Sequence, residues 1–116
     1  MTAVYTHDRY NKLVEATFRK VVELGQLKGG EYAGDTDRLA NFRRNAERFG
    51  VTMELIWGVY AGKHWDAISQ FVNDVQNKRT RKRLEGLAGR ADDLIVYLLL
   101  FKAMVEERED SEEPEP

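Results

Sequence analysis

The 116-residue chain contains no cysteine, which excludes disulfide bonds, thiolate catalysis and cysteine-ligated zinc. The absence of cysteine also fits a reducing compartment. Its two prolines, Pro114 and Pro116, come so late that neither interrupts a helix upstream. The most apolar run, 94–105, includes Lys102 and falls short of the roughly 20 residues that a membrane span needs. With no secretory signal pattern visible either, we predict a cytoplasmic protein without a membrane partner.

The chain also lacks a large excess of positive or negative charge. Its net charge is −2, which gives no general attraction to nucleic acid. The distribution is uneven: 78–83 is a basic run, while 106–115 is almost wholly acidic. We interpret the first as a solvated loop and the second as a frayed tail. The alternative is a phosphate-binding loop that the tail covers. One basic patch on an acidic chain gives little support for nucleic acid as a partner.

What the chain does have is apolar residues at helical spacing, with no alternating strand pattern of useful length. Hydrophobic residues make up 42% and charged residues 33%, as in a soluble helical domain. Short connections favour an antiparallel bundle of about four helices, all-α in class. The final helix is apolar nearly all round, so we expect it to be central. The predicted helices cover 6–27, 38–49, 53–77 and about 90–107, in a single domain over 1–107 followed by an acidic disordered tail over 108–116.

Local signals fix several helix ends. Asp37 belongs to a capping sequence for the second helix, Gly50 suits its C-terminal end, and Thr52 opens the third helix. Within that third helix, Gly58 and Gly62 lie four residues apart. They either let another helix approach closely or weaken the helix locally.

Charged and polar groups lie inside these apolar patterns. His64 falls on the aromatic side of the third helix, where it is either a buried neutral imidazole or a group that moves protons or hydrogen-bonds phosphate. Lys63 either pairs with Asp66 or contacts phosphate. Asn41 lies one turn from Asn45, and two asparagines in a short helix indicate either polar function or a tolerant surface.

Asp92 and Asp93 open the last helix, where carboxylates complement the helix dipole. Adjacent acids are also hard oxygen ligands for Mg²⁺, and Arg90 just before them suits a bidentate grip on phosphate. A third cluster spans 28–35, in the first loop. If it folds over this end, Glu31 adds a further metal ligand. Convergence of the clusters would make a polyanion or metal-phosphate site.

The same loop holds Lys28, a further cation for phosphate, and Tyr32. Tyr32 either stacks on a base or anchors the loop to the core.

The order Lys28-Gly-Gly-Glu-Tyr-Ala-Gly-Asp, Leu39-Ala-Asn-Phe, Lys63-His64 and Gly89-Arg-Ala-Asp-Asp-Leu-Ile-Val-Tyr resembles a family of small helical phage and prophage proteins, the nucleotide-modification-associated proteins. That family carries a Lys-x-x-Asp-Tyr-Gly-like loop and a final Asp-Leu-x-x-Tyr helix. In this chain Glu31 replaces the loop aspartate, and Ala33 precedes Gly34. The resemblance implies a nucleotide ligand and, for a phage gene, the cytoplasm of a bacterial host.

More distantly, the layout is similar to MazG-like all-α nucleotide pyrophosphohydrolases. Those enzymes hold Mg²⁺ with a Glu-x-x-Glu helix and a later Glu-x-x-Asp helix, and this chain has neither motif. The resemblance implies a Mg²⁺-dependent hydrolase with Glu31, Asp92 and Asp93 on the metal. The remaining roles would fall to His64 for proton transfer and to Lys28, Tyr32, Asn41, Lys63 and Arg90 for the nucleotide.

Two other functions stay open at this point. The first is a non-catalytic sponge that sequesters a nucleotide-derived signal, which requires cationic and aromatic groups without a full metal set. The second is a structural helical module for protein interaction, with the outer faces of the helices over 6–27 and 53–77 forming a homo-oligomer.

Overall fold

The computed structural model describes residues 3–28, 36–83 and 86–111, with the side chains of 27 and 28 left out. It contains helices α1 (His7–Lys28), α2 (Ala40–Phe49), α3 (Met53–Gln76) and α4 (Leu87–Ser111), and the described residues form no strand. The predicted all-α bundle is therefore confirmed. None of these helices combines the length and apolarity that crossing a bilayer demands, as far as the described residues go.

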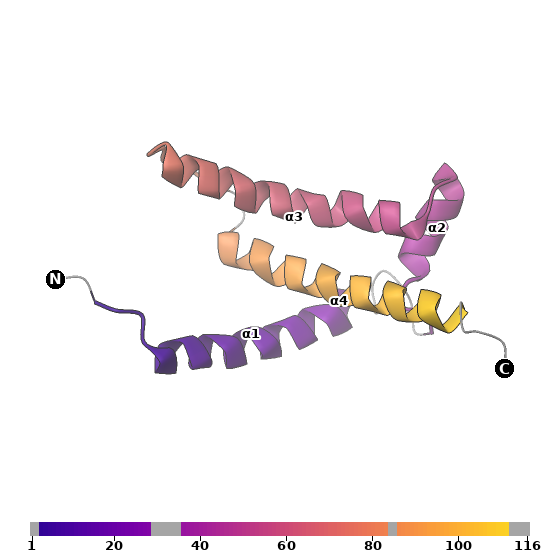
Figure 1. Cartoon of the computed structure of the whole chain (residues 1–116), viewed down its shortest axis with the longest axis horizontal. Helices are drawn as coiled ribbons and strands as arrows, with labels where there is room; N and C mark the ends of the chain where they lie inside the picture. The colour runs from indigo at the N-terminus through magenta and orange to yellow at the C-terminus, as the bar shows by residue number, and fades with distance from the viewer. Residues whose placement is uncertain (1–2, 29–35, 84–85, 112–116) are drawn as a thin grey trace.

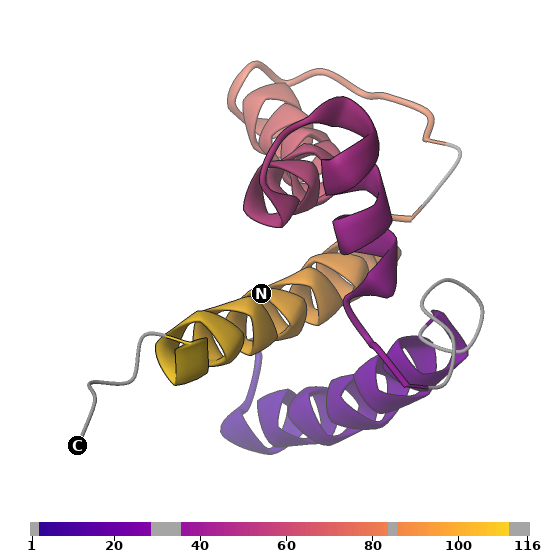
Figure 2. The ribbon, with the colours of Figure 1, turned by 90° about the vertical axis from the view of Figure 1, so that its right-hand side faces the viewer.

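Helix α4 is the centre of the molecule, as its all-round apolar sequence predicts (Figures 1 and 2). It packs against α3 on one side and α1 on the other. The α3 and α4 helices run antiparallel, whereas α1 runs in the same direction as α4 (Figure 1). The short helix α2 packs across the beginning of α3. The bundle is thus a row of three long helices with one short helix at its end.

The hydrophobic core lies where α2, α3 and α4 meet. Phe42 is the buried residue of α2, and Met104 on α4 is the most deeply buried large side chain of the described chain. Trp57 on α3 closes one side by donating its indole N–H to the carbonyl of Tyr97, at 2.6 Å. The buried cluster consists of Val21, Leu39, Phe42, Met53, Val96, Leu100 and Met104.

Two of the predicted helix-end residues take the positions assigned to them. The Thr52 hydroxyl accepts a hydrogen bond from the backbone N–H of Leu55 (3.2 Å), which starts α3. The prediction that the sequence around Asp37 caps α2 is wrong: the N-cap is Leu39, with no side-chain cap hydrogen bond, and the Asp37 carboxylate accepts from the N–H of Leu39 (3.0 Å) in the turn before the helix. Helix α2 begins at Ala40, slightly later than predicted. Gly50 ends α2 in the left-handed region, with φ of 65°.

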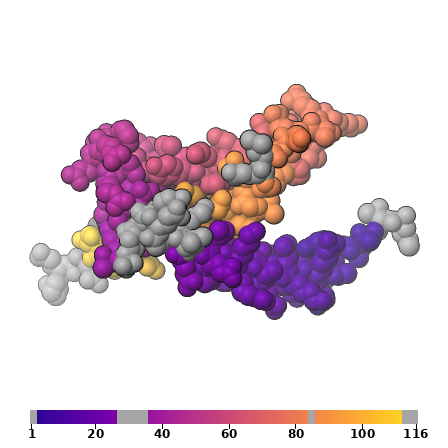
Figure 3. All heavy atoms as spheres, turned by 180° about the vertical axis from the view of Figure 1, so that it is seen from behind, coloured from indigo at the N-terminus to yellow at the C-terminus, as the bar shows by residue number. Residues whose placement is uncertain are grey.

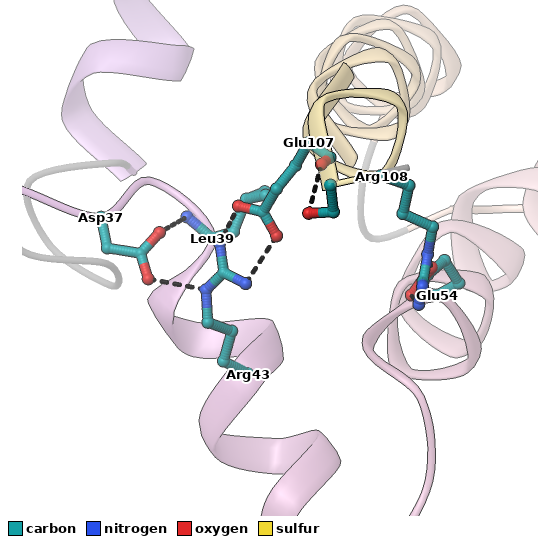
Figure 4. Close-up of polar contacts among 7 residues, drawn as sticks. Asp37, Leu39, Arg43, Glu54, Glu107 and Arg108 are labelled. Atoms are coloured by element: carbon teal, nitrogen blue, oxygen red, sulfur yellow. Dashed lines mark hydrogen bonds and ion pairs between the residues drawn. The ribbon is translucent and has the colours of Figure 1, made fainter. Parts of the chain in front are cut away.

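Helix α4 extends beyond both predicted ends, since it begins at Leu87 and continues to Ser111. The prediction that the last helix ends at about 107 is therefore wrong. Arg43 of α2 grips the Glu107 carboxylate, and the adjacent Arg108 pairs with Glu54 of α3 (Figure 4). These two contacts bind the acidic end of α4 to its neighbours, which a local reading of charge does not reveal. Residues 112–116 of the predicted tail lie outside the described residues.

Two glycine substitutions are expected to have opposite effects on stability. Gly50→Ala forces a Cβ into the left-handed region and should lower the free energy of unfolding by about 1 kcal/mol. Apart from the two chain neighbours and the backbone of α3 itself, no described atom lies within 4 Å of the space that a Cβ would fill at Gly58. Gly58→Ala should therefore stabilise α3 by up to about 1 kcal/mol. Chemical denaturation of both variants measures this, and a loss of stability in Gly58→Ala would contradict it.

Candidate functional site

A pocket of about 370 Å³ opens between α2, α3 and α4. Its apolar part is the aromatic surface around Phe42, whose ring meets those of Tyr60 (6.2 Å between centroids) and Tyr97 (6.5 Å) edge-on. The complete lining consists of Arg38, Asn41, Phe42, Tyr60, Asp93, Val96, Tyr97 and Leu100. A cavity with aromatic walls and a few convergent polar groups is typical of small-molecule sites.

Two polar groups enter the pocket from α2 and the turn before it. The Arg38 guanidinium donates to the carbonyl of Gly25 at the end of α1 (3.3 Å), and partial burial lowers the pKa of Arg38 from its usual value. An arginine remains charged even so. Asn41 also lines the pocket, and Asn45 donates its amide to the Asn41 carbonyl (2.9 Å). The asparagine pair therefore forms an ordered polar edge on α2.

His64 lies beside this pocket and links α3 to α4. Its ring packs against Tyr97, with 5.4 Å between centroids, and its side chain is 13% exposed. The Nδ1 atom lies 3.4 Å from Arg90 Nη1 and 3.8 Å from the Asp93 carboxylate. Because a guanidinium only donates, a neutral His64 faces Arg90 with Nδ1 as acceptor. Of the three clusters that the sequence could bring together, the ones around His64 and Arg90 thus meet, whereas the loop over 29–35 lies outside the described residues.

Asp92 does not join that group. Its carboxylate pairs with Lys20 of α1 (3.2 Å) and lines a separate groove between α1 and α4. Neighbouring helical residues point about 100° apart, so the Asp92 and Asp93 carboxylates face different cavities. Among the described residues no cluster of three histidines or acids is placed to hold a metal ion. The structure thus separates two of the three predicted ligands, and the third, Glu31, lies outside the described residues.

The other predicted site residues are spread more widely. Lys63 is exposed on α3 and does not line the pocket beside His64. Lys28 ends α1, but its side chain is outside the described part, as is the whole of Tyr32. The roles assigned to these residues therefore stay predictions.

Sequence reasoning did not assign Arg38, Tyr60 or Tyr97 to the site, although a signal was available for the two tyrosines. Tyr97 follows Asp93 by four positions, so the two share a face of α4. Tyr60 likewise precedes His64 by one turn of α3. Arg38 lies in the turn before α2, where helical spacing gives no such signal.

The basic run is more ordered than a solvated loop, because Asp74 near the end of α3 holds two of its arginines. The Asp74 side chain is 3% exposed and accepts from Arg81 Nε (2.8 Å) and Arg83 Nη2 (3.0 Å). The hydrogen bond from Arg81 is the main cause that lowers the pKa of Asp74. Arg83 also lies over the Phe71 ring (5.4 Å). Residues 78–82 are exposed, as a solvated loop should be, but Asp74 ties Arg81 and Arg83 to α3.

Comparison with known proteins adds no family assignment. No protein-family model, curated protein or solved structure matches this chain. The resemblance to nucleotide-modification-associated proteins therefore stays a prediction, and the functional argument depends on the pocket itself.

Proposed function

We propose that the pocket between α2, α3 and α4 binds a nucleotide or a nucleotide-derived small molecule. The observation that supports this is the gathering of Arg38, Asn41, Tyr97 and the His64–Arg90 pair around one cavity. Aromatic surface, amide and cations are the groups that recognise a base and a phosphate together. The described residues support non-catalytic binding, in the manner of a sponge, better than hydrolysis.

Each group has a distinct role in this proposal. Tyr97 and Tyr60 offer aromatic surface to a base, and Asn41 offers an amide to its polar edge. Arg38 supplies a partly desolvated guanidinium for phosphate, which suits bidentate recognition. Arg90 adds a second guanidinium beside the pocket, and His64 holds it through Nδ1. The volume of about 370 Å³ suits one nucleotide unit rather than a long polymer.

A magnesium-dependent pyrophosphohydrolase has little support from the described pocket. Asp93 is the one carboxylate among its lining residues, and it lies near His64. Mg²⁺ in phosphate sites usually takes one or two carboxylates together with water and phosphate oxygens, so Asp93 supplies the minimum. A ligand such as Glu31 would complete a stronger metal site, and we assign no hydrolytic step to the described residues.

Calorimetric titration with nucleoside mono-, di- and triphosphates and cyclic dinucleotides tests the proposal, each in Mg²⁺ and in chelator. We expect at least one of these ligands to bind in both conditions and to be recovered intact. Arg38→Gln should weaken that binding by roughly 10- to 100-fold, because a charge-assisted hydrogen bond contributes about 1.5–3 kcal/mol.

Arg48→Gln is the matched control, since Arg48 is an exposed arginine in the last turn of α2, the helix that follows Arg38. It should leave the affinity unchanged. Equal weakening by both substitutions would indicate general electrostatic attraction instead of a pocket. Binding that requires Mg²⁺ and ends in released pyrophosphate would replace the sponge with the hydrolase.

A further inference from the structure

The chain exposes far more surface than a compact monomer of its size. Its accessible area is 9407 Å² at a mass of 13.4 kDa, whereas a folded monomer of that mass exposes about 6,500 Å². Its radius of gyration is 17.8 Å, against about 13 Å for a compact domain of this length. A structure this open leaves apolar surface that a single copy does not cover.

Helix α1 accounts for much of that open surface. Of the described helices it packs against α4 only, and it forms a ridge along one edge of the molecule (Figures 2 and 3). Between α1 and α4 lies a groove of about 520 Å³, lined mainly by apolar side chains. Leu13 and Leu99, on its two walls, are each 51% exposed. Large contiguous apolar patches on a soluble protein mark interaction sites.

Helix α1 forms one wall of the groove and also carries exposed side chains that could fill the groove of a second copy. Phe18, at the rim, is 71% exposed, and Val22 one turn later is 51% exposed. A surface that carries both protruding side chains and a groove can be complementary to a second copy of itself, as a twofold interface requires. We propose that the α1–α4 groove is a homodimer interface in which the α1 helices of two copies pack antiparallel, each placing Phe18 in the groove of the other.

The charges on α1 fit this arrangement. Glu15 and Arg19 flank Phe18 on the outer side of the helix. If two α1 helices cross antiparallel near residue 17, Glu15 of each copy faces Arg19 of the other, so both ion pairs form at the rim. A parallel arrangement in register would place like charges together instead. Charge therefore favours the antiparallel pair over an apolar ligand, which needs no such pattern.

The α1–α4 face exposes apolar side chains along its whole length. Leu13, Phe18, Val22 and Leu99 are each more than half exposed. A stable interface of standard size covers about 800 Å² per partner, which the length of a 22-residue helix and its groove can provide. Exposed residues on α3, such as Trp65 and Val72 at 59% and 60%, leave area for further contacts between dimers.

Light scattering coupled to gel filtration, together with sedimentation equilibrium, tests the interface. The wild-type chain should have at least twice the 13.4 kDa mass of one copy. Phe18→Glu should weaken association at least tenfold. Phe49→Glu is the matched control, because Phe49 is 67% exposed at the end of α2 and does not line the groove. It should associate like the wild type.

A second readout avoids disrupting the interface. The chain has no cysteine of its own, so Phe18→Cys and Phe49→Cys each provide a single thiol. A short bismaleimide should crosslink Phe18→Cys chains into dimers and leave Phe49→Cys chains mostly single. A monomeric wild type at 100 µM, or equal association of the two glutamate variants, would overturn the proposal. A monomer that takes up an apolar dye in the groove would overturn it in favour of an apolar ligand.

Discussion

Replacing Phe42 with alanine is expected to lower the free energy of unfolding by about 3–5 kcal/mol, as for other buried phenylalanines. The Phe42 side chain is 4% exposed and lies where α2 meets α3 and α4. Its edge-on contacts with Tyr60 and Tyr97 would be lost along with its burial. Helix α2 has 10 residues and is too short to persist without tertiary packing. Urea denaturation followed by circular dichroism measures the loss.

Phe49→Ala provides the control within the same helix. Phe49 is 67% exposed, so its replacement should change stability by no more than about 0.5 kcal/mol. Because Phe42 also lines the pocket, its alanine variant should lose nucleotide binding even under conditions where it is still folded. Similar losses of stability in the two variants would show that α2 is not anchored through Phe42.

Some helix ends could be predicted from the sequence because the residues at those ends determine them. Thr52 and Gly50 mark the start of α3 and the end of α2, because a hydroxyl caps a helix N-terminus and glycine tolerates positive φ. The end of α4 was not predictable in this way. Arg43 meets Glu107 near that end, 64 positions away in the chain, and a local reading of an acidic run indicates only a tail.

Part of the site could be predicted, because helical spacing shows which residues lie on the same face of a helix. His64, Arg90 and Asp93 each lie on apolar helices, and packing those helices together brings the three side chains to one place. Which of two adjacent aspartates faces inward depends on the rotation of α4 about its axis. That rotation is fixed by packing against α3 and α1, so the pairing of Asp92 with Lys20 could not be read from the sequence.

Acidification is expected to lower the stability of the folded protein, because four carboxylates form hydrogen-bonded ion pairs with arginines in the folded state. The pKa values of Asp37 and Glu107 are lowered chiefly by hydrogen bonds from Arg43, that of Glu54 by Arg108, and that of Asp74 by Arg81. A lowered pKa means that folding favours the charged carboxylate. The stabilisation is therefore complete above the ordinary pKa values of 3.8 and 4.5, and it is lost as the pH falls through the lowered ones.

The melting temperature should accordingly be nearly constant from pH 7 to 5 and fall by roughly 10 °C between pH 5 and 3. Arg43→Gln removes the partner of two of these carboxylates, so it should melt lower at pH 7 and fall less steeply below pH 4.5. Arg48→Gln, on the same helix, should keep the full acid dependence. Solvent screening limits each contribution, since Asp37 and Glu107 are each 41% exposed. Identical acid profiles for the two variants would mean that the ion pairs joining α2 to α4 add nothing to stability in solution.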